Sequence, residues 1–394
     1  MRIYADNAGT SFPKPPEVTE AMVKFARECG VAAGRGSFTE AKVCHEIIVN
    51  CRKRMARLIG AGAGDWIVFA MNCSEALNIA IRGLLRNAPA GSHAIATAME
   101  HNSVLRPYHA LAEQCGLAFD IVDCDPKTGI VDPDDIRRAI RPGTRLICCT
   151  HASNVTGSLQ PVEKVSAIAR KHGVPCLIDA SQSAGHVPID VQAVGADFMA
   201  FPGHKGLLGP LGTGVLYVRA GAEKLLSTMK EGGTGTQSEL MSQPTNMPDM
   251  LEIGSPNGIG IAGLSEAVAW LLARGVDSIR KHDRELTDLF LDLTGGIAKL
   301  QVSGPRDSEN RVAVFCVNVP GHKPLELAER LEKEFGVLTR AGLHCAPLAH
   351  KAVGTFPAGA CRISFGVFNT QEHVRHVAGA LEKIAMRKTA AVRA

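Results

Sequence analysis

The sequence lacks cysteine pairs with the C-x-x-C spacing and lacks any long apolar segment. None of its twelve cysteines forms a C-x-x-C pair, which argues against a structural zinc or iron–sulfur site. No stretch approaches the roughly 20 apolar residues that span a bilayer. The start, MRIYADNAGTSFPKPPE, has no positive stretch followed by an apolar core, so we expect no signal peptide. We therefore expect a cytoplasmic protein with reduced thiols, no metal and no membrane partner.

Charge of one sign is also scarce. The chain has 43 basic and 39 acidic residues, a formal net charge of +4, and its basic residues are scattered. We therefore expect no nucleic-acid partner. The glycine-rich GPLGTG precedes a strand-like run instead of a helix, and GGTGTQSE lacks the lysine followed by Ser or Thr of a P-loop. A nucleotide site is not expected either.

Short β-rich runs alternate with helical patterns between about residues 65 and 220. DWIVFAM leads into SEALNIAIRGLLRNA, and the same order recurs around HAIATAMEH, RLICCTHAS, PCLIDASQS and DFMAFPGHK. Strands that alternate with helices predict βαβ units and a doubly wound, mostly parallel sheet. Cys148 and Cys149 lie inside one of the apolar runs, and we expect them to be small core residues.

After the segment IGSPN the pattern changes. A helical stretch from about 260 to 293, broken at Gly275, precedes a mixture of β-rich runs and helices. A chain of 394 residues is too long for a single core. We therefore predict a large α/β domain at 15–257 and a smaller α+β domain formed by 1–14 together with 258–394.

Two isolated charges follow apolar runs. Asp179 ends the run CLI in IDASQ, and Lys205 follows DFMAF in FPGHKG. In a doubly wound sheet the residues after the strands gather at one edge, so both should lie on the same rim. A carboxylate for a protonated pyridine nitrogen and a lysine for a Schiff base would together hold pyridoxal phosphate. The alternative is a structural ion pair between the two side chains, although buried pairs stabilise proteins weakly.

Further polar side chains fall on the same rim. Ser74 in NCSEALN stands where a helix N-cap is expected, and helix N-termini bind phosphate. His101 could stack on an aromatic ring, while Asn154 and Gln182 are neutral hydrogen-bonding groups. Taken alone, Ser74 would be a cap and His101 a partly buried histidine. On one rim with Lys205, they predict a cofactor site.

These motifs resemble those of the class V aminotransferase family of pyridoxal-phosphate enzymes. The resemblance runs over nearly the whole chain, from YADNAGTSFPKPP through NCSEALN, MEHNS, THASNVTG, IDASQ, FPGHKG and GSPN to RAGLHCAP and CRISFGVFNT. Within the family, the HCA of AGLHCAP is similar to the cysteine desulfurase branch, which includes selenocysteine lyases. The resemblance implies fold-type I, with a large doubly wound domain and a smaller α+β domain.

The resemblance implies a role for each rim residue. Lys205 would be the Schiff-base lysine and later the proton carrier, and Asp179 would pair with the pyridine nitrogen. Gln182 would touch the ring hydroxyl and His101 would stack on the ring. Asn154 would lie near the ring and the substrate carboxylate.

A phosphate site and a second subunit are also implied. Ser74, His204 and the backbone around Cys73 would hold the phosphate. Ser255 would reach the phosphate of the other subunit, which implies a homodimer. Family members often have Ser or Thr where this chain has Pro202, so one hydroxyl contact to the phosphate is missing.

Two residues would act on the substrate. Arg362 would bind its carboxylate, and Cys345 would accept its sulfur, with His344 as one group that could help to ionise the thiol. Related desulfurases often carry a further histidine where this chain has Leu343. The alternative for Cys345 is a small loop residue without a catalytic role.

The expected reaction removes sulfur from L-cysteine, leaving L-alanine and a persulfide on the enzyme that a protein acceptor could empty. Three other readings stay open. A selenocysteine lyase would use the same residues. An aminotransferase or epimerase of the same fold would need Lys205 but no thiol, and a non-catalytic scaffold or sulfur-carrier partner would bind no cofactor.

Overall fold

The largest element of the computed structural model, which describes residues 2–33 and 36–386, is a seven-stranded sheet. Its order is β2-β8-β7-β6-β5-β3-β4, and only β8 runs antiparallel to its neighbours. The predicted mostly parallel sheet is confirmed. The strands are β2 (Trp66–Ala70), β3 (His93–Thr97), β4 (Ala118–Val122), β5 (Thr144–Thr150), β6 (Cys176–Asp179), β7 (Phe198–Pro202) and β8 (Gly214–Val218).

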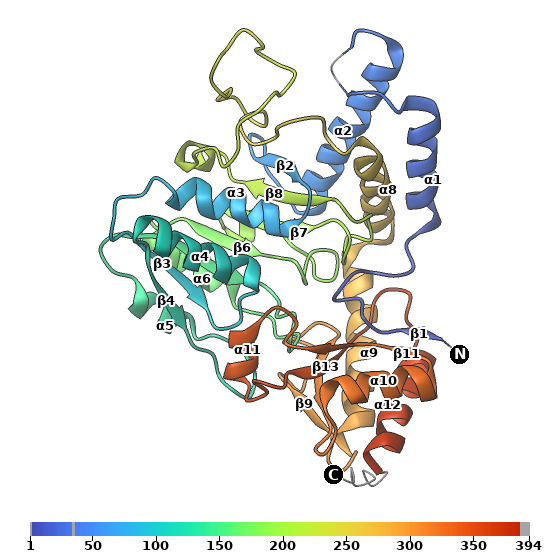
Figure 1. Cartoon of the computed structure of the whole chain (residues 1–394). Coiled ribbons are helices and arrows are strands. Elements are labelled where there is room, and N and C mark those ends of the chain that lie inside the picture. The colour runs from blue at the N-terminus through green and yellow to red at the C-terminus, as the bar shows by residue number, and fades with distance from the viewer. Residues whose placement is uncertain (1, 34–35, 387–394) are drawn as a thin grey trace.

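Helices cover both faces of this sheet (Figure 1). One core lies between the sheet and α3 and α4, and the other lies against α2, α6 and α8. Cys148 and Cys149 on β5 are buried in opposite cores, because side chains alternate along a strand. These helices are α2 (Thr39–Leu58), α3 (Cys73–Leu85), α4 (Asn102–Cys115), α6 (Val162–Lys171) and α8 (Gly258–Arg274), with α1 (Pro16–Lys24), α5 (Pro133–Ala139) and α7 (Val191–Val194) beside them.

A smaller antiparallel sheet, in the order β12-β13-β10-β9, follows in the chain. Its core contains the rings of Phe290, Phe315 and Phe365, whose centroids lie 4.3 to 6.0 Å apart. The elements are α9 (Val276–Gly295), β9 (Gln301–Ser303), β10 (Val314–Asn318), α10 (Pro324–Phe335), β12 (Arg340–Gly342), α11 (Pro347–Ala352), β13 (Ala360–Ser364) and α12 (Gln371–Met386).

The predicted helix break at Gly275 is confirmed, since α8 ends and α9 begins there. The apolar side of α8 belongs to the core of the large sheet, through Ile261, Leu264 and Leu271. The division of the chain after residue 257 stays a prediction. No single helix in the described part of the chain is long and apolar enough to cross a bilayer; α8 and α9 meet that criterion only as a pair bent by 80°.

The N-terminal segment links the two sheets. Strand β1 (Ile3–Tyr4) pairs in parallel with β11 (Val337–Leu338). The next residues cross to the large sheet, where the backbone N–H of Ser11 and the Lys14 ammonium donate to the His204 carbonyl at 3.0 and 2.9 Å. His204 lies in the loop after β7 and directly precedes Lys205, so the N-terminal segment is fixed to the loop that carries Lys205.

A buried arginine joins the loop after β5 to the segment that carries the smaller sheet. Arg311 is fully buried, and its Nη2 donates to the carbonyls of Thr156 and Val314 at 2.7 Å each. Burial lowers the pKa of Arg311 to about 9. Next to it, the Gly157 carbonyl accepts from the N–H of Val312 at 3.0 Å. The THASNVTG segment is therefore held between the two sheets.

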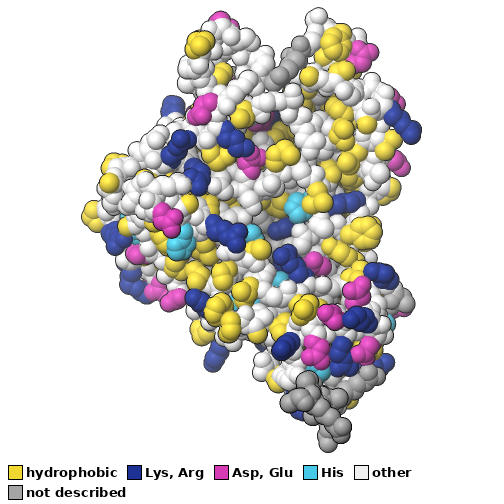
Figure 2. Space-filling model, viewed as in Figure 1, with side chains coloured by type: hydrophobic (Ala, Val, Ile, Leu, Met, Phe, Trp, Pro, Cys, Tyr) yellow, Lys and Arg dark blue, Asp and Glu magenta, His cyan; other side chains and the backbone are white. Residues whose placement is uncertain are grey.

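Charges of both signs are interspersed over the face seen in Figure 2, without a single basic field. This distribution agrees with the small net charge of +4.

We predict that Gly157→Ala will destabilise the protein more than Gly173→Ala does. Both glycines have left-handed backbones, with φ of 76° and 65°. A Cβ on Gly157 would lie 2.5 Å from the Val314 carbonyl oxygen, whereas a Cβ on Gly173 would meet nothing within 4 Å. The left-handed conformation costs each variant about 1–2 kcal/mol, and the clash should add about 1–3 kcal/mol to Gly157→Ala.

The measurement is the free energy of unfolding in urea, followed by circular dichroism. Gly173→Ala is the matched control, because it carries the backbone cost without the contact. An equal loss of unfolding free energy in the two variants would show that the backbone around Gly157 and Val314 accommodates the added methyl group without cost.

Candidate active site

Five loops at one edge of the large sheet enclose a cavity of about 90 Å³. They follow the carboxyl ends of β2, β3, β5, β6 and β7, the edge at which ligands bind in doubly wound sheets. Eight residues singled out from the sequence line this cavity, which are Cys73, Ser74, His101, Asn154, Asp179, Gln182, His204 and Lys205. Ser255, Cys345 and Arg362 lie outside its lining.

Lys205 and Asp179 both face this cavity but do not form an ion pair, so that alternative for the two charges is excluded. The Asp179 Oδ1 accepts from the Ser181 N–H at 2.9 Å and from the Cys73 thiol at 3.8 Å. Its Oδ2 has no hydrogen-bond partner among the described residues. Burial lowers the pKa of Lys205, while the Asp179 carboxylate opposes that shift. The site therefore offers a buried amine and a free carboxylate oxygen.

His101 is held by a hydroxyl that sequence reasoning missed. Its Nδ1 accepts from the Ser103 N–H at 3.0 Å, and the Ser103 hydroxyl lies 2.9 Å from the same nitrogen. Burial lowers the pKa of His101 to about 4, so the ring is neutral at pH 7. Because Nδ1 accepts, the proton of the neutral ring is on Nε2. The Ser103 hydroxyl also lies 2.6 Å from that of Ser74.

The N-cap of α3 is Asn72, and the prediction that Ser74 caps this helix is wrong. The Asn72 side chain accepts from the Glu75 N–H at 3.0 Å. An asparagine two positions earlier is an equally good cap and reaches the third helical N–H. Ser74 instead lies in the first turn, where helix N–H groups and the dipole favour an anion.

His204, on the loop after β7, lines the same cavity as the first turn of α3. Its Nδ1 is buried and has no hydrogen-bond partner among the described residues. Burial lowers the pKa of His204 to about 4, with Lys205 and Lys14 adding to the shift. A buried nitrogen without a partner is costly unless a ligand satisfies it. Pro202, the last residue of β7, also lines the cavity.

Gln182 uses part of its amide to hold the N-terminal segment. Its Nε2 donates to the Ala8 carbonyl at 3.0 Å, and the side chain still lines the cavity. The expected contact between Gln182 and a ring hydroxyl would therefore involve the other end of the amide.

Cys345 lies on an exposed loop that is attached to the rim of the cavity. Its carbonyl accepts from the Asn102 N–H at 2.7 Å, and the Asn154 side chain donates to the His344 carbonyl at 2.6 Å. Both His344 and Cys345 have left-handed backbones, with φ of 50° and 58°. Such conformations are strained in residues with a side chain and cluster at functional sites.

The His344 ring does not hydrogen-bond the Cys345 thiol. Its Nε2 lies 3.1 Å from the Arg340 carbonyl and its Nδ1 lies 3.1 Å from the His350 Nε2. A carbonyl only accepts, so His344 Nε2 carries the proton and Nδ1 accepts from His350. Burial lowers the pKa of His344 to about 3. The group 4.0 Å from the Cys345 Sγ is instead the Nη2 of Arg340.

Arg362 is buried in β13 beside this loop. Its Nη1 donates to the Asn154 carbonyl at 3.2 Å, and its Nη2 pairs with the Asp6 carboxylate at 2.6 Å. Its Nε is buried without a partner among the described residues. Burial lowers the pKa of Arg362, and Asp6 opposes the shift. A planar guanidinium with unused donors suits a carboxylate ligand.

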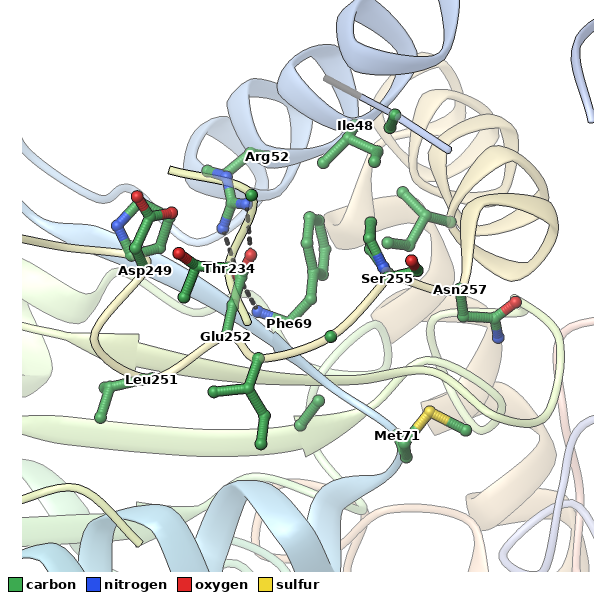
Figure 3. Close-up of a pocket in the computed structure, with 18 of the residues that line it drawn as sticks. Ile48, Arg52, Phe69, Met71, Thr234, Asp249, Leu251, Glu252, Ser255 and Asn257 are labelled. Carbon is green, nitrogen blue, oxygen red and sulfur yellow. Dashed lines mark hydrogen bonds and ion pairs between the residues drawn. The ribbon is translucent and has the colours of Figure 1, made fainter. Parts of the chain in front are cut away.

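Ser255 lies in a second, larger cavity of about 440 Å³ (Figure 3). This cavity is bounded by α2, the end of β2, the start of α3 and the segment 229–257. Arg52 and Glu252 form a bidentate ion pair in its wall, with N–O distances of 2.7 and 3.0 Å. The structure thus places Ser255 away from the lining of the smaller cavity.

Sequence reasoning missed four residues at the site, which are Asp6, Ser103, Ser181 and Arg340. Ser103 and Ser181 each lie two positions after a predicted residue, His101 and Asp179, and this spacing could have found them. Asp6 and Arg340 carry no such local signal. Within the described part of the chain, no cluster of three or more His, Cys, Asp or Glu side chains could hold a metal ion.

The residues fit pyridoxal phosphate. A buried amine without an ion pair, a carboxylate with a free oxygen and an unsatisfied His204 Nδ1 line one cavity. The first turn of α3 offers N–H groups to a phosphate. Lys205 would hold the aldehyde, Asp179 the ring nitrogen, and Ser74 with His204 the phosphate.

Comparisons with known proteins agree with this site. The chain is 34% identical over 387 residues to a probable cysteine desulfurase of Methanothermobacter thermautotrophicus, covering 97% of this chain and 94% of the relative. A probable cysteine desulfurase of Pyrococcus abyssi gives the same identity and coverage. The apo structure of a cysteine desulfurase from Thermococcus onnurineus superposes with a TM-score of 0.91 at 32% identity, over 98% of this chain and 94% of that one.

The architecture is that of fold-type I pyridoxal-phosphate enzymes. The family model for class-V aminotransferases matches residues 3–377, a span that includes every loop of the cavity together with Cys345 and Arg362. The family implies a cofactor of the pyridoxal-phosphate type. The chain belongs to the class-V aminotransferase family.

Proposed function

We propose that the protein is a pyridoxal-phosphate-dependent cysteine desulfurase that converts L-cysteine to L-alanine and carries the sulfur as a persulfide on Cys345. The observation that carries the proposal is the half-buried Lys205, which has no ion-pair partner among the described residues and faces the same cavity as Asp179, with an exposed thiol on the adjoining loop. The likeness to cysteine desulfurases supports the same activity.

Each group has a task that its surroundings suit. When bound, the cofactor would withdraw electrons from the substrate's α-carbon. Burial lowers the pKa of Lys205, which favours a neutral amine that can bind the cofactor and afterwards move the α-proton. Asp179 would keep a proton on the pyridine nitrogen, and Arg362 would bind the substrate carboxylate through its unused donors.

The thiol step balances without an external oxidant. The Cys345 thiolate attacks the sulfur of bound cysteine, the new S–S bond forms, and the carbon–sulfur bond breaks. The electron pair of that bond stays with the carbon skeleton, which takes up a proton and leaves as alanine. The Arg340 Nη2 is the group that lies 4.0 Å from the attacking Sγ.

The product persulfide would need an acceptor outside the site. Cys345 is the exposed member of twelve free cysteines, so a protein or small thiol could reach it. We propose that this transfer takes place in the cytoplasm, where thiols stay reduced.

We also propose that the active unit is a homodimer in which Ser255 serves the phosphate of the other subunit. Ser255 is exposed and lies in the larger cavity, whose wall includes Met71 and Glu75 beside the start of α3. Met71, in the wall of this cavity, is an apolar side chain that is 54% exposed.

The first prediction concerns Lys205. Borohydride reduction of the cofactor-loaded protein should fix a pyridoxyl group on the peptide that contains Lys205, because a buried amine of lowered pKa is nucleophilic. Lys14 provides the control, since burial lowers its pKa to about 8 and it contacts the His204 carbonyl. Mass spectrometry should find the label in Lys14→Gln and lose it in Lys205→Ala. A label that persists in Lys205→Ala would contradict the assignment.

The second prediction concerns Cys345. Cys345→Ser should bind the cofactor and still change its absorbance when cysteine is added, because those steps need no thiol. Alanine production from cysteine should fall by about two powers of ten or more, the scale expected when a catalytic group is lost. Persulfide should be trapped on the Cys345 peptide of the wild-type protein.

Cys115→Ser is the control, because that thiol is partly exposed at the end of α4, away from the lining of the cavity. It should keep normal turnover. If Cys345→Ser desulfurates cysteine at the wild-type rate, Cys345 is an ordinary loop residue. If only selenocysteine is turned over by Cys345→Ser, the selenocysteine lyase activity is favoured.

The third prediction tests whether sites are shared. Lys205→Ala and Ser255→Asp chains, each nearly inactive alone, are unfolded together, refolded and loaded with cofactor. Random pairing of equal amounts makes half of the dimers mixed. If Ser255 acts across the dimer, each mixed dimer has one intact site out of two, so the mixture should regain about a quarter of wild-type activity. If Ser255 acts within its own chain, no intact site forms and the mixture stays inactive. Sedimentation of the same samples checks that dimers are present.

A further inference from the structure

Asp6 already occupies one side of the arginine to which we assign the substrate carboxylate. The Asp6 Oδ1 lies 2.6 Å from Arg362 Nη2, and the arginine side chain is only 2% exposed. A guanidinium has five N–H donors. Two of them are used, on Asp6 and on the Asn154 carbonyl, while Nε and the remaining donors have no partner among the described residues.

The Asp6 carboxylate is held in this position by the N-terminal segment. A Cβ on Gly9 would lie only 2.7 Å from the Asp6 Oδ2, so the carboxylate packs directly against the Gly9 backbone. The Asp6 carbonyl accepts from the Gly9 N–H at 2.9 Å and from the Tyr4 hydroxyl at 3.1 Å. The side chain still keeps 21% of its surface exposed, so it borders open space instead of a sealed core.

The charges around the pair are otherwise positive. Arg340 is the direct cross-strand neighbour of Arg362, and like charges opposite each other repel. The other ionisable groups that act on Arg362 include the hydroxyl of Tyr4, while the neutral rings of His344 and His350 feel the arginine's charge. Asp6 is therefore the carboxylate that neutralises this part of the site when no substrate is present.

We propose that Asp6 is a built-in competitor for the substrate carboxylate at Arg362. It holds the guanidinium in place in the free enzyme, and its negative charge weakens the hold of Arg362 on the carboxylate of the bound amino acid. This inference rests on the proposed function, in which Arg362 binds that carboxylate. Asp6 is a positioning residue, because it acts through Arg362 and not on the reacting atoms.

The consequence for turnover is faster exchange of amino acids. Substrate and product share the same α-carboxylate, so any group that weakens this contact also speeds the departure of alanine. When alanine leaves, the Asp6 carboxylate neutralises the charge of Arg362. The guanidinium is then not buried without a counter-ion, a state that is strongly unfavourable.

The test measures binding of L-alanine to the cofactor-loaded protein by calorimetry. Asp6→Asn keeps the shape and the hydrogen-bond acceptor but removes the charge. The Kd for L-alanine should fall about three- to tenfold, because one like charge near the bound carboxylate is gone. Ethylamine, which has the amine but no carboxylate, should bind the variant and the wild type equally well.

Two further variants separate this role from a structural one. Asp197→Asn removes the carboxylate of the Arg219 pair at the opposite edge of the large sheet, and it should leave both affinities unchanged. In an Arg362→Gln background, Asp6→Asn should no longer change alanine binding. Asp6→Asn alone leaves Arg362 without a counter-ion, whereas the double variant has no arginine at that position. The double variant therefore provides the comparison if Asp6→Asn alone folds poorly.

An alanine affinity that is unchanged or weaker in Asp6→Asn overturns the proposal, as does an equal gain for alanine and ethylamine. Persistence of the Asp6→Asn effect without Arg362 would also overturn it. Alanine binding needs no thiol, so the result is independent of sulfur transfer. A wild-type protein that binds alanine but releases no sulfur from cysteine would refute the desulfurase activity and leave the role of Asp6 standing.

Discussion

The partial burial of Lys205 without an ion-pair partner among the described residues constrains the rest of the site. A lysine ammonium removed from water is costly, and here the nearby Asp179 carboxylate lowers that cost without forming an ion pair. The backbone around the lysine is fixed instead. The Gly203 N–H donates to the Thr213 carbonyl at 2.8 Å, and the Lys205 carbonyl accepts from the Leu208 N–H at 2.8 Å. A rigid loop thus holds a reactive amine where a flexible one would turn to solvent.

Asn154 connects the three chemical tasks assigned to the site. Its side chain lines the cofactor cavity and donates to the His344 carbonyl, while its own carbonyl accepts from Arg362. Since Cys345 follows His344, one residue contacts the cavity that contains Lys205, the loop that carries the thiol and the arginine proposed to bind the substrate carboxylate. The loop that carries Asn154 is fixed from the other side by Arg311, which donates to the Thr156 carbonyl. Packing between the sheets therefore determines the geometry of the site.

The cavity could be predicted from the sequence because its residues obey a local rule. Asp179, His101 and Lys205 each follow an apolar run, and parallel strands bring such positions to one edge. The cap of α3 was mispredicted because Asn72 and Ser74 are both good caps, and only the local backbone decides between them. Motif and spacing therefore located the side chains more reliably than their hydrogen bonds.

Other features depend on contacts that no local pattern encodes. Asp6 and Arg362 are 356 positions apart, and nothing near either residue indicates the other. The His344 ring could have turned to the thiol or away from it. His350, six residues later, provides the buried partner that turns it away.

The attachment of the N-terminal segment has a consequence for how the protein is made. The Asn7 side chain donates to the Ser364 carbonyl, and the Ala8 N–H donates to the Ser364 hydroxyl, so these residues pair with one that is synthesised more than 350 positions later. The ribosome emits Lys205 long before β13 exists. The strands of the large sheet all precede β13 in the chain, so Arg362 can meet the Asp6 carboxylate only after those strands have been made. In a nascent chain the strands that carry the cavity loops are therefore complete before Asp6 has its arginine.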